Sequence, residues 1–312
     1  MAPSLEQRLA ALRNFDPAAP KALEIVRTGL RASIGVVVEA AAKLVGEHRL
    51  DALVPELVDA FARLADKERD PGCRGKLAIG HALHALDRWD DRVFVAGLAI
   101  TQPEGWKPAD DTAAPLRGLC AIAHAHFNRD DALDVLAVVL ADPERAARLG
   151  AAQGLGDSGK IGATALLRYK VLAGDVEPEV TSTCVESLLA LNRGGSIDFL
   201  VGLLAAHDER AEIVALALGG ARVDAARESL ITWCDAARPA QRQRVGYLAL
   251  ALLRDDTATA HVLDAIRTRG KPDALAAARA LATFRDDKLA AQIRSAAADH
   301  DVATRRELDA LL

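Results

Sequence analysis

Leu248-Ala-Leu-Ala-Leu-Leu-Arg-Asp-Asp256 is an apolar, alanine-rich segment that ends in an Arg-Asp-Asp turn. A second copy, Ala278-Arg-Ala-Leu-Ala-Thr-Phe-Arg-Asp-Asp287, places its own Arg-Asp-Asp turn 31 residues later (254 to 285). Earlier versions end at Asp91 and Asp131. A period of roughly 30 to 40 residues with helical apolar spacing is typical of a repeat array. The sequence therefore predicts an all-α protein whose helices stack in series and bury their apolar faces against neighbours.

The chain divides into consecutive helix pairs, each with a first helix A and a second helix B. Prolines mark the expected start of several B helices, where a missing N–H costs nothing because it has no intrahelical partner. These are Pro71, Pro115, Pro143, Pro178, Pro239 and Pro272. The expected pairs are 20–31 with 33–47, 51–68 with 72–88, 90–101 with 116–128, 131–141 with 144–155, 160–173 with 178–191, 195–206 with 208–221, 224–236 with 239–253 and 257–269 with 272–284.

The segment Ala141-Asp-Pro-Glu-Arg-Ala-Ala-Arg-Leu-Gly-Ala-Ala-Gln-Gly-Leu-Gly-Asp157 resembles the second helix of a HEAT repeat. It is similar to the HEAT-like repeats of phycobilisome-lyase-related proteins. The resemblance implies a right-handed α-α superhelix of about eight helix pairs, with A helices convex and B helices concave. It also implies structural roles for Asp142 and Arg145 in a polar ladder between repeats. We expect a capping helix in 1–17, the array in 18–300 with an insertion at 102–114, and a C-terminal cap in 301–312.

Composition disfavours several classes of partner. The net charge is -5 and both signs are spread along the chain, whereas nucleic-acid and anionic-membrane surfaces need clustered positive charge. No uncharged run approaches the roughly 20 residues that cross a bilayer, and the N-terminus lacks the apolar core of a signal peptide. The four cysteines are far apart and form no CxxC pair, which suits a reducing compartment. We expect a cytoplasmic protein.

The insertion is the one break in the repeat rhythm. It contains Trp106 among polar residues, and insertions in repeat arrays fall in loops that often bind partners. An exposed tryptophan is a candidate interface anchor, with Glu104 and Lys107 beside it. Trp89, at the end of the preceding B helix, could complete one aromatic patch with Trp106. The alternative is that Trp106 folds back over the ends of its own helices.

Histidines gather in the two B helices that flank the insertion, at His81, His84, His124 and His126. Aligning the Asp-Asp turns shifts one helix by 40 residues (90 to 130) and places His84 on His124. We therefore expect these two side chains to line one groove, and His126 to lie on the core-facing stripe.

A metal site would need three or four ligands, and Cys120 or Asp87 could join the histidines. The chain has no His-Glu dipeptide, so the di-iron site of deoxyhypusine-hydroxylase-type HEAT proteins is not expected. We expect no metal and no cofactor.

Catalytic motifs do not single out a reaction. The chain has no GxSxG, GxxxxGK[ST], HExxH or strand-borne GxGxxG, and its Asp-Asp pairs recur at turns as helix caps would. The sequence leaves enzymatic activity open and favours a non-catalytic scaffold or adaptor. It would bind another protein, or a second copy of itself, through the concave face and the insertion 102–114. The alternative is a HEAT-like enzyme or nucleic-acid-binding protein acting in the groove of His84 and His124.

Overall fold

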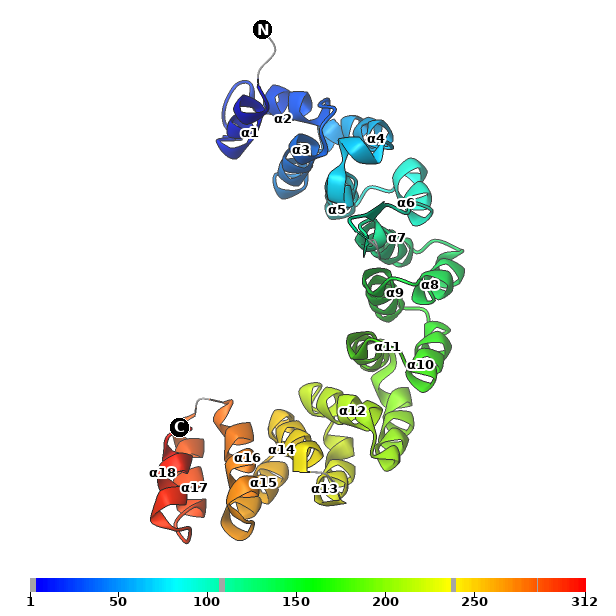
Figure 1. Cartoon of the computed structure of the whole chain (residues 1–312). Helices are drawn as coiled ribbons and strands as arrows, with labels where there is room; N and C mark the ends of the chain where they lie inside the picture. The colour runs from blue at the N-terminus through cyan, green and yellow to red at the C-terminus, as the bar shows by residue number, and fades with distance from the viewer. Residues whose placement is uncertain (1–3, 107–109, 237–239, 285) are drawn as a thin grey trace. The chain divides into compact units, whose positions relative to one another are not determined.

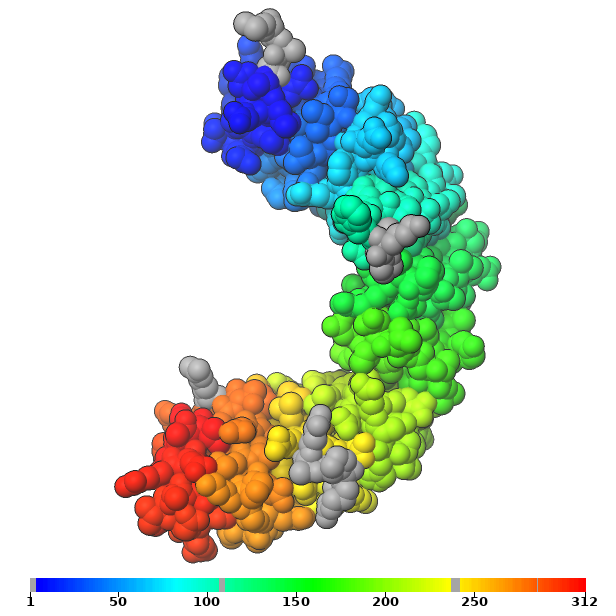
Figure 2. Space-filling view, in the orientation of Figure 1, coloured from blue at the N-terminus to red at the C-terminus, as the bar shows by residue number. Residues whose placement is uncertain are grey.

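The computed structural model describes residues 4–106, 110–236, 240–284 and 286–312, without the side chains of 240 and 241. These ranges form 18 α-helices, and each helix packs mainly against its neighbours in sequence. The predictions of an all-α fold and of sequential helix pairs are confirmed. The chain divides into two compact units, Met1–Ala163 and Thr164–Leu312. In each unit, side chains fill the spaces between the helix ribbons (Figure 2).

In the first unit, the A helices α2, α4, α6 and α8 form one row and the B helices α3, α5, α7 and α9 form the other (Figure 1). Short 3-10 turns η1, η2 and η3 and a two-stranded ribbon connect them. The bounds are α1 Leu5–Arg13, α2 Ala22–Leu30, α3 Gly35–Glu47, η1 Asp51–Leu53, α4 Val54–Arg63, η2 Lys67–Arg69, η3 Pro71–Cys73, α5 Arg74–Ala85, α6 Asp91–Leu98, β1 Pro103–Glu104, β2 Asp110–Asp111, α7 Ala114–His126, α8 Ala132–Leu140 and α9 Arg145–Asp157.

In the second unit, α12, α14 and α16 pack in sequence as B helices, with α13 and α15 as A helices on their other side (Figure 1). The bounds are α10 Ala163–Ala173, α11 Pro178–Leu203, η4 Leu204–Ala206, α12 Glu209–Gly220, η5 Asp224–Ala226, α13 Arg227–Ala236, α14 Ala240–Leu253, α15 Asp256–Thr268, α16 Lys271–Ala282, α17 Asp287–Ala296 and α18 Val302–Asp309.

Helix α11 contains a break that separates a B helix from the next A helix. Asn192 is non-helical, with φ -149° and ψ 67°, and its side-chain oxygen accepts a hydrogen bond from the Gly195 N–H at 3.2 Å. Residues 178–191 and 193–203 are therefore two helices, as the pairing predicted. By length and composition alone, Pro178–Ala206 is the one stretch of the described residues that could cross a membrane. The break at Asn192 lies within it, as do Arg193 and Asp198.

Aspartates begin many of the helices. Asp90, Asp255 and Asp286 each hold the N-cap position and accept a hydrogen bond from a backbone N–H of the first turn. A side-chain oxygen at this position satisfies an N–H that has no intrahelical partner, which stabilises a helix by about 1 kcal/mol. These three Asp-Asp turns are therefore helix caps, whereas Asp131 holds the N-cap position of α8 without a side-chain hydrogen bond. Two of the predicted markers, Pro239 and Arg285, lie outside the described residues.

Most of the described B helices end at a residue other than glycine. Five B helices are followed by a non-glycine residue in the left-handed conformation, with φ between 48° and 59°. In α5, the N–H groups of Asp87 and Arg88 then donate to the carbonyls of His84 and Leu83, which is the Schellman arrangement. The five left-handed residues are Arg49, Asp87, Asn128, Arg222 and Arg254.

Candidate functional site

The insertion forms a short antiparallel ribbon. Pro103 pairs with Asp111 and Glu104 with Asp110, so the described residues Gly105 and Trp106 begin the tip of the ribbon. The sequence predicted an all-α protein, and this two-stranded ribbon is the exception within the described residues. Gly105 has φ +91°, a conformation that favours glycine, and a Cβ there would meet nothing within 4 Å. The ribbon therefore turns tightly just before Trp106.

The base of the ribbon is fixed to the A–B turn of the preceding helix pair. Glu104 accepts hydrogen bonds from the Gly72 N–H and from the Gln102 side-chain amide, both at 2.8 Å. Gln102, only 3% exposed, also donates to the Asp70 carbonyl at 2.8 Å. Burial opposes ionisation of Glu104, but the hydrogen bonds from Gln102, Gly72 and Thr112 outweigh it and lower the pKa of that carboxyl. Glu104, predicted as a partner contact, thus fastens the ribbon to the array.

A buried ladder of ion pairs supports this base. Asp111 accepts from the Gln102 N–H at 2.7 Å and pairs with Arg117 at 2.7 Å. Arg117 also donates to both carboxylate oxygens of Asp142, at 2.7 and 2.9 Å, which joins one helix pair to the next. Asp142 therefore lies in an inter-repeat ladder as the resemblance implied, and its described partner across the repeat boundary is Arg117.

The ladder repeats with a fixed spacing. An aspartate before a B helix is followed six residues later by a basic residue inside that helix: Asp70 with Lys76, Asp111 with Arg117, and Asp142 with Arg148. Asp70 and Lys76 form an ion pair at 3.1 Å in which each side chain is 1% exposed. A buried pair of this kind needs further hydrogen bonds to offset the loss of water. Asp70 receives them from the Gly75 and Lys76 N–H groups.

Trp106 projects from this fixed base into solvent. Its side chain is 95% exposed, so the alternative that it folds back over its own helices is wrong. An indole buries roughly 200 Å² when it becomes fully enclosed, and about 25 cal/mol per Å² gives a gross gain of about 5 kcal/mol for a partner that covers it. Lys107, the other predicted contact at the tip, lies outside the described residues.

Trp89 belongs to a different cluster at the far ends of the same helices. Its ring stacks on Phe94 at 5.1 Å and meets the edges of His124 and Phe127 at 4.8 and 5.6 Å. The cluster follows the C-terminal ends of α5 and α7, whereas the ribbon contacts the turn that precedes α5. Helix α5 has 12 residues, and at 1.5 Å per residue it is about 18 Å long. Trp89 and Trp106 therefore do not form one aromatic patch.

The predicted pairing of His84 with His124 is also wrong. The His84 ring lies against His126, with centroids 4.6 Å apart, and His126 contacts the Asp87 carboxylate at 2.8 Å. His124 is 1% exposed and its Nδ1 lies 2.7 Å from the Cys120 carbonyl, so it is a core residue and lines no groove. His126, expected in the core, has a side chain that is 45% exposed.

A one-residue error in the alignment explains this exchange. The left-handed residues Asp87 and Asn128 are 41 residues apart (87 to 128), and the helix starts Asp91 and Ala132 are also 41 apart (91 to 132). The Asp-Asp turns had given 40. One residue rotates a helical position by about 100°, so His124 occupies the place of the buried Leu83 instead of that of His84.

Neither a metal site nor a reactive thiol stands out in the described part of the chain. Across residues 4–106, 110–236, 240–284 and 286–312, no group of three or more His, Cys, Asp or Glu residues could hold a metal ion. All four cysteines are buried free thiols. Burial raises the pKa of the thiols of Cys73, Cys184 and Cys234 to about 12, which keeps them protonated and unreactive at neutral pH.

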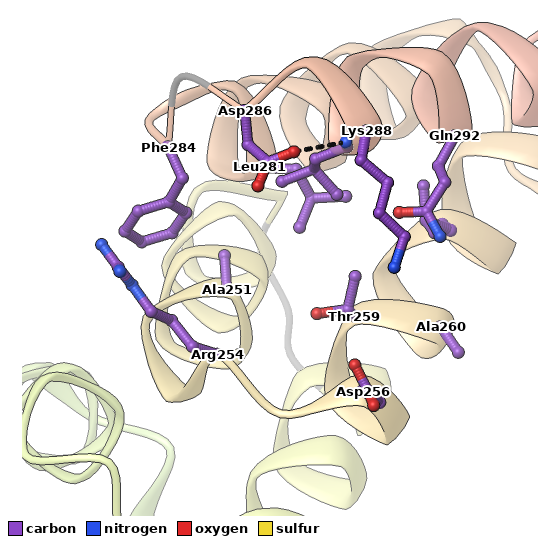
Figure 3. A pocket seen from close by; sticks show the side chains of 12 residues that line it. Ala251, Arg254, Asp256, Thr259, Ala260, Leu281, Phe284, Asp286, Lys288 and Gln292 are labelled. Atoms are coloured by element: carbon purple, nitrogen blue, oxygen red, sulfur yellow. Dashed lines mark hydrogen bonds between the residues drawn. The ribbon is translucent and has the colours of Figure 1, made fainter.

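A cavity of about 500 Å³ lies in the second unit between α14, α15, α16 and α17. Figure 3 shows Arg254 over the ring of Phe284, at 4.4 Å, on one side and Thr259, Lys288 and Gln292 on the other. Arg254, Lys288 and Gln292 are exposed, and the Asp286 carboxylate is committed to the Leu289 N–H at 3.0 Å. The polar groups on this rim are solvated and hold no fixed constellation that would define a reaction.

No protein-family model and no curated protein matches the chain. The geometry of the ribbon base adds two residues to those predicted, Gln102 and Arg117. Gln102 was missed because its contacts with Asp70 and Glu104 are unrecognisable before the ribbon folds. Arg117 could have been found, because the six-residue spacing from acid to base is visible in the sequence at three successive B helices.

Proposed function

We propose that the protein is a non-catalytic interaction module that binds another protein through Trp106 at the tip of the 103–111 ribbon. The observation that carries the proposal is the contrast between the 95% exposure of Trp106 and the 3% exposure of Gln102 at the ribbon's base. A large apolar side chain held in water by a buried polar base has no role in the core. It is the arrangement expected of an interface anchor.

We further propose that the scaffold is a HEAT-like α-solenoid, with B helices on the concave face. Three features support this: the succession of helix pairs, the buried Asp-to-base ladder at the A–B turns, and the close contact of neighbouring B helices. The close contact is clearest between α7 and α9, where a Cβ on Gly150 of α9 would lie 2.5 Å from the Cα of Gly118 in α7. Stacked units of this kind supply extended surface without a single core.

Pre-organisation is what the ribbon contributes to binding. Ordering a flexible loop on association costs conformational entropy, which lowers affinity. Here the contacts of Glu104, Gln102 and Asp111 have already fixed the base. We propose a cytoplasmic location, in keeping with four buried free thiols.

The test is affinity capture with the full-length chain. The immobilised wild type, Trp106→Ala and Val138→Ala would be compared on extracts of the source cells. Val138 in α8 is 74% exposed and serves as the matched apolar control in the same unit. We expect one protein to be retained in stoichiometric amount by wild type and Val138→Ala and at least ten-fold less by Trp106→Ala. Equal retention of the partner by the wild type and both variants would contradict the role of Trp106. Retention of a second copy of this protein would identify the partner as the protein itself.

A further inference from the structure

The second unit carries an apolar row on the exposed side of its B helices. The left-handed residues Arg222 and Arg254 are 32 residues apart (222 to 254), and the N-caps Asp255 and Asp286 are 31 apart (255 to 286). These registers place Leu216 of α12, Leu248 of α14 and Arg279 of α16 at equivalent positions. Leu216 and Leu248 are half-buried, and Val245 and Leu252 beside Leu248 are half-buried too.

A groove lies at the α11–α12 end of this row. A cavity of about 430 Å³ lies between the 178–191 part of α11 and α12, with Ala190, Leu216, Ala217 and Gly220 among its lining. A Cβ built on Gly220 would meet nothing within 4 Å, so the floor is open to an incoming side chain. The groove and the leucine row together form a surface that we call the B-helix groove.

Packing between repeats does not require this apolar character. The equivalent position, six residues before the left-handed residue, is Lys43 in α3 (49 to 43), His81 in α5 (87 to 81) and Ile122 in α7 (128 to 122). Lys43 and His81 are exposed and polar, whereas Ile122 is half-buried. Helices α3 and α5 therefore pack with a polar residue in this row, so packing alone does not require Leu216 and Leu248 to be apolar.

Unpaired positive charge marks one end of the groove. Arg244 and Arg279 are exposed there, and no described carboxylate lies within ion-pairing distance of either guanidinium. At the other end Glu186 and Arg193 both line the cavity, and the Arg193 guanidinium donates to the neutral carbonyls of Ala221 and Arg222, so it keeps its positive charge. The charge that an occupant must match is therefore the positive charge at Arg244 and Arg279.

We infer that the B-helix groove binds an amphipathic helix, with its apolar face on Leu216 and Leu248 and its acidic end at Arg279. The groove walls are helices whose backbone groups bond internally, so they offer no strand edge, and the occupant must satisfy its own backbone. Four neighbouring B helices spaced about 8–10 Å apart span roughly 24–30 Å, which is the length of a helix of about 16–20 residues.

The inference extends the proposed binding function to a second surface and is tested independently of Trp106. The probes are two fluorescein-labelled 18-residue synthetic helices with the same leucine face. One has glutamates at its N-terminal end and lysines at its C-terminal end, and the other has lysines at both ends. Fluorescence anisotropy with the full-length protein measures Kd. We expect the wild type to bind the mixed-charge helix at least five-fold more tightly than the lysine-ended helix.

Three variants decide the outcome. Gly220→Gln places a side chain on the groove floor, where its Cβ meets no atom within 4 Å, and should weaken the binding of both probes at least five-fold. Val176→Gln, at an exposed position outside the groove, should change neither affinity. Arg279→Glu should reverse the preference between the two probes. Wild-type affinity in Gly220→Gln, or an unchanged preference in Arg279→Glu, overturns the inference. So does binding of neutral phosphatidylcholine vesicles that is lost in Gly220→Gln, because it assigns the groove to lipid.

The Trp106→Ala variant distinguishes binding at the ribbon from binding in the B-helix groove. It should bind both helices as the wild type does, because Trp106 lies in the first unit and the groove in the second. Loss of probe binding in Trp106→Ala would contradict the assignment to the B-helix groove. A negative result in the partner-capture experiment leaves these affinities unchanged.

Discussion

Arg117 of α7 holds Asp142, which precedes α9, through two hydrogen bonds of 2.7 and 2.9 Å. The same guanidinium contacts Asp111 at the base of the ribbon. The carboxylates of Asp142 and Asp111 together raise the pKa of Arg117, although burial acts against it. One buried side chain therefore joins two helix pairs and the element that presents Trp106.

Removing one partner of this buried pair should destabilise the fold strongly. Asp142→Ala leaves the Arg117 guanidinium, 6% exposed, without its bidentate acceptor. Breaking a buried ion pair costs about 3–5 kcal/mol, so we predict a fall of at least about 3 kcal/mol in the free energy of unfolding. Arg92→Ala breaks the pair with Asp90, in which Arg92 is 67% exposed, and should cost less than about 1 kcal/mol. Urea titration of both variants measures the two losses, and similar small values would contradict the role given to the ladder.

Replacing a glycine by alanine should destabilise the fold at a contact between B helices and stabilise it at the surface. A Cβ on Gly150 would lie 2.5 Å from the Gly118 Cα, so Gly150→Ala must separate α7 from α9. Overpacking of this kind costs about 1–3 kcal/mol. Gly220→Ala meets no atom within 4 Å and should gain up to about 1 kcal/mol from helix propensity. Thermal unfolding should therefore move in opposite directions for the two variants, and a shift of the same sign in both would count against the close approach of α7 and α9.

The contact between α5 and α7 should make stability sensitive to acid. Burial, with smaller contributions from His126 and His81, lowers the pKa of His84 from 6.5, while Asp87 acts in the opposite direction. The folded state thus binds a proton at this site less readily than the unfolded state does. Its contribution to stability is present above pH 6.5 and is lost as the pH falls through the lowered folded pKa.

His84→Gln tests this linkage. Urea unfolding at pH 7.5 and at pH values below 6.5 should show a smaller loss of stability on acidification in the variant than in the wild type. His48→Gln replaces an exposed histidine of the same unit and is the matched control, which should follow the wild type. An identical pH dependence in all three proteins would show that His84 does not contribute.

The ribbon should loosen when its buried amide is removed. Gln102→Ala deletes the two hydrogen bonds that the buried side-chain amide donates to the Asp70 carbonyl and to Glu104. The Thr112 N–H, which donates to the Gln102 carbonyl at 3.0 Å, should then exchange with deuterium faster. Glu68→Ala, at an exposed position in the nearby turn η2, should leave that exchange rate unchanged. Unaltered exchange in Gln102→Ala would mean that the ribbon is held by other contacts.

The helix pairs could be predicted because their signals are local. Prolines near helix starts and aspartates at N-caps act within one turn of the backbone, and they mark Pro178 and Asp255 without any long-range information. The exposure of Trp106 was also open to prediction, because an apolar residue within a polar insertion has few neighbours to cover it.

The alignment of the histidines of α5 with those of α7 could not be predicted from the Asp-Asp turns, because the two aspartate pairs take different positions relative to the helices that follow them. Asp90 is the N-cap of α6, so the first aspartate of that pair caps the helix, whereas Asp131 holds the corresponding position before α8 and is the second of its pair. The one-residue difference is set by tertiary packing. The ribbon base was hidden for a similar reason, since Glu104 bonds to Gly72, 32 residues away.

The most direct test of the central claim is photo-crosslinking from the tip of the ribbon in the source cells. p-Benzoylphenylalanine would replace Trp106 in one full-length protein and Val138 in another. We predict one dominant crosslinked species of defined mass from position 106 and no dominant species from position 138. Crosslinks that are equally diffuse from both positions would contradict the claim that Trp106 is the anchor of a protein interface.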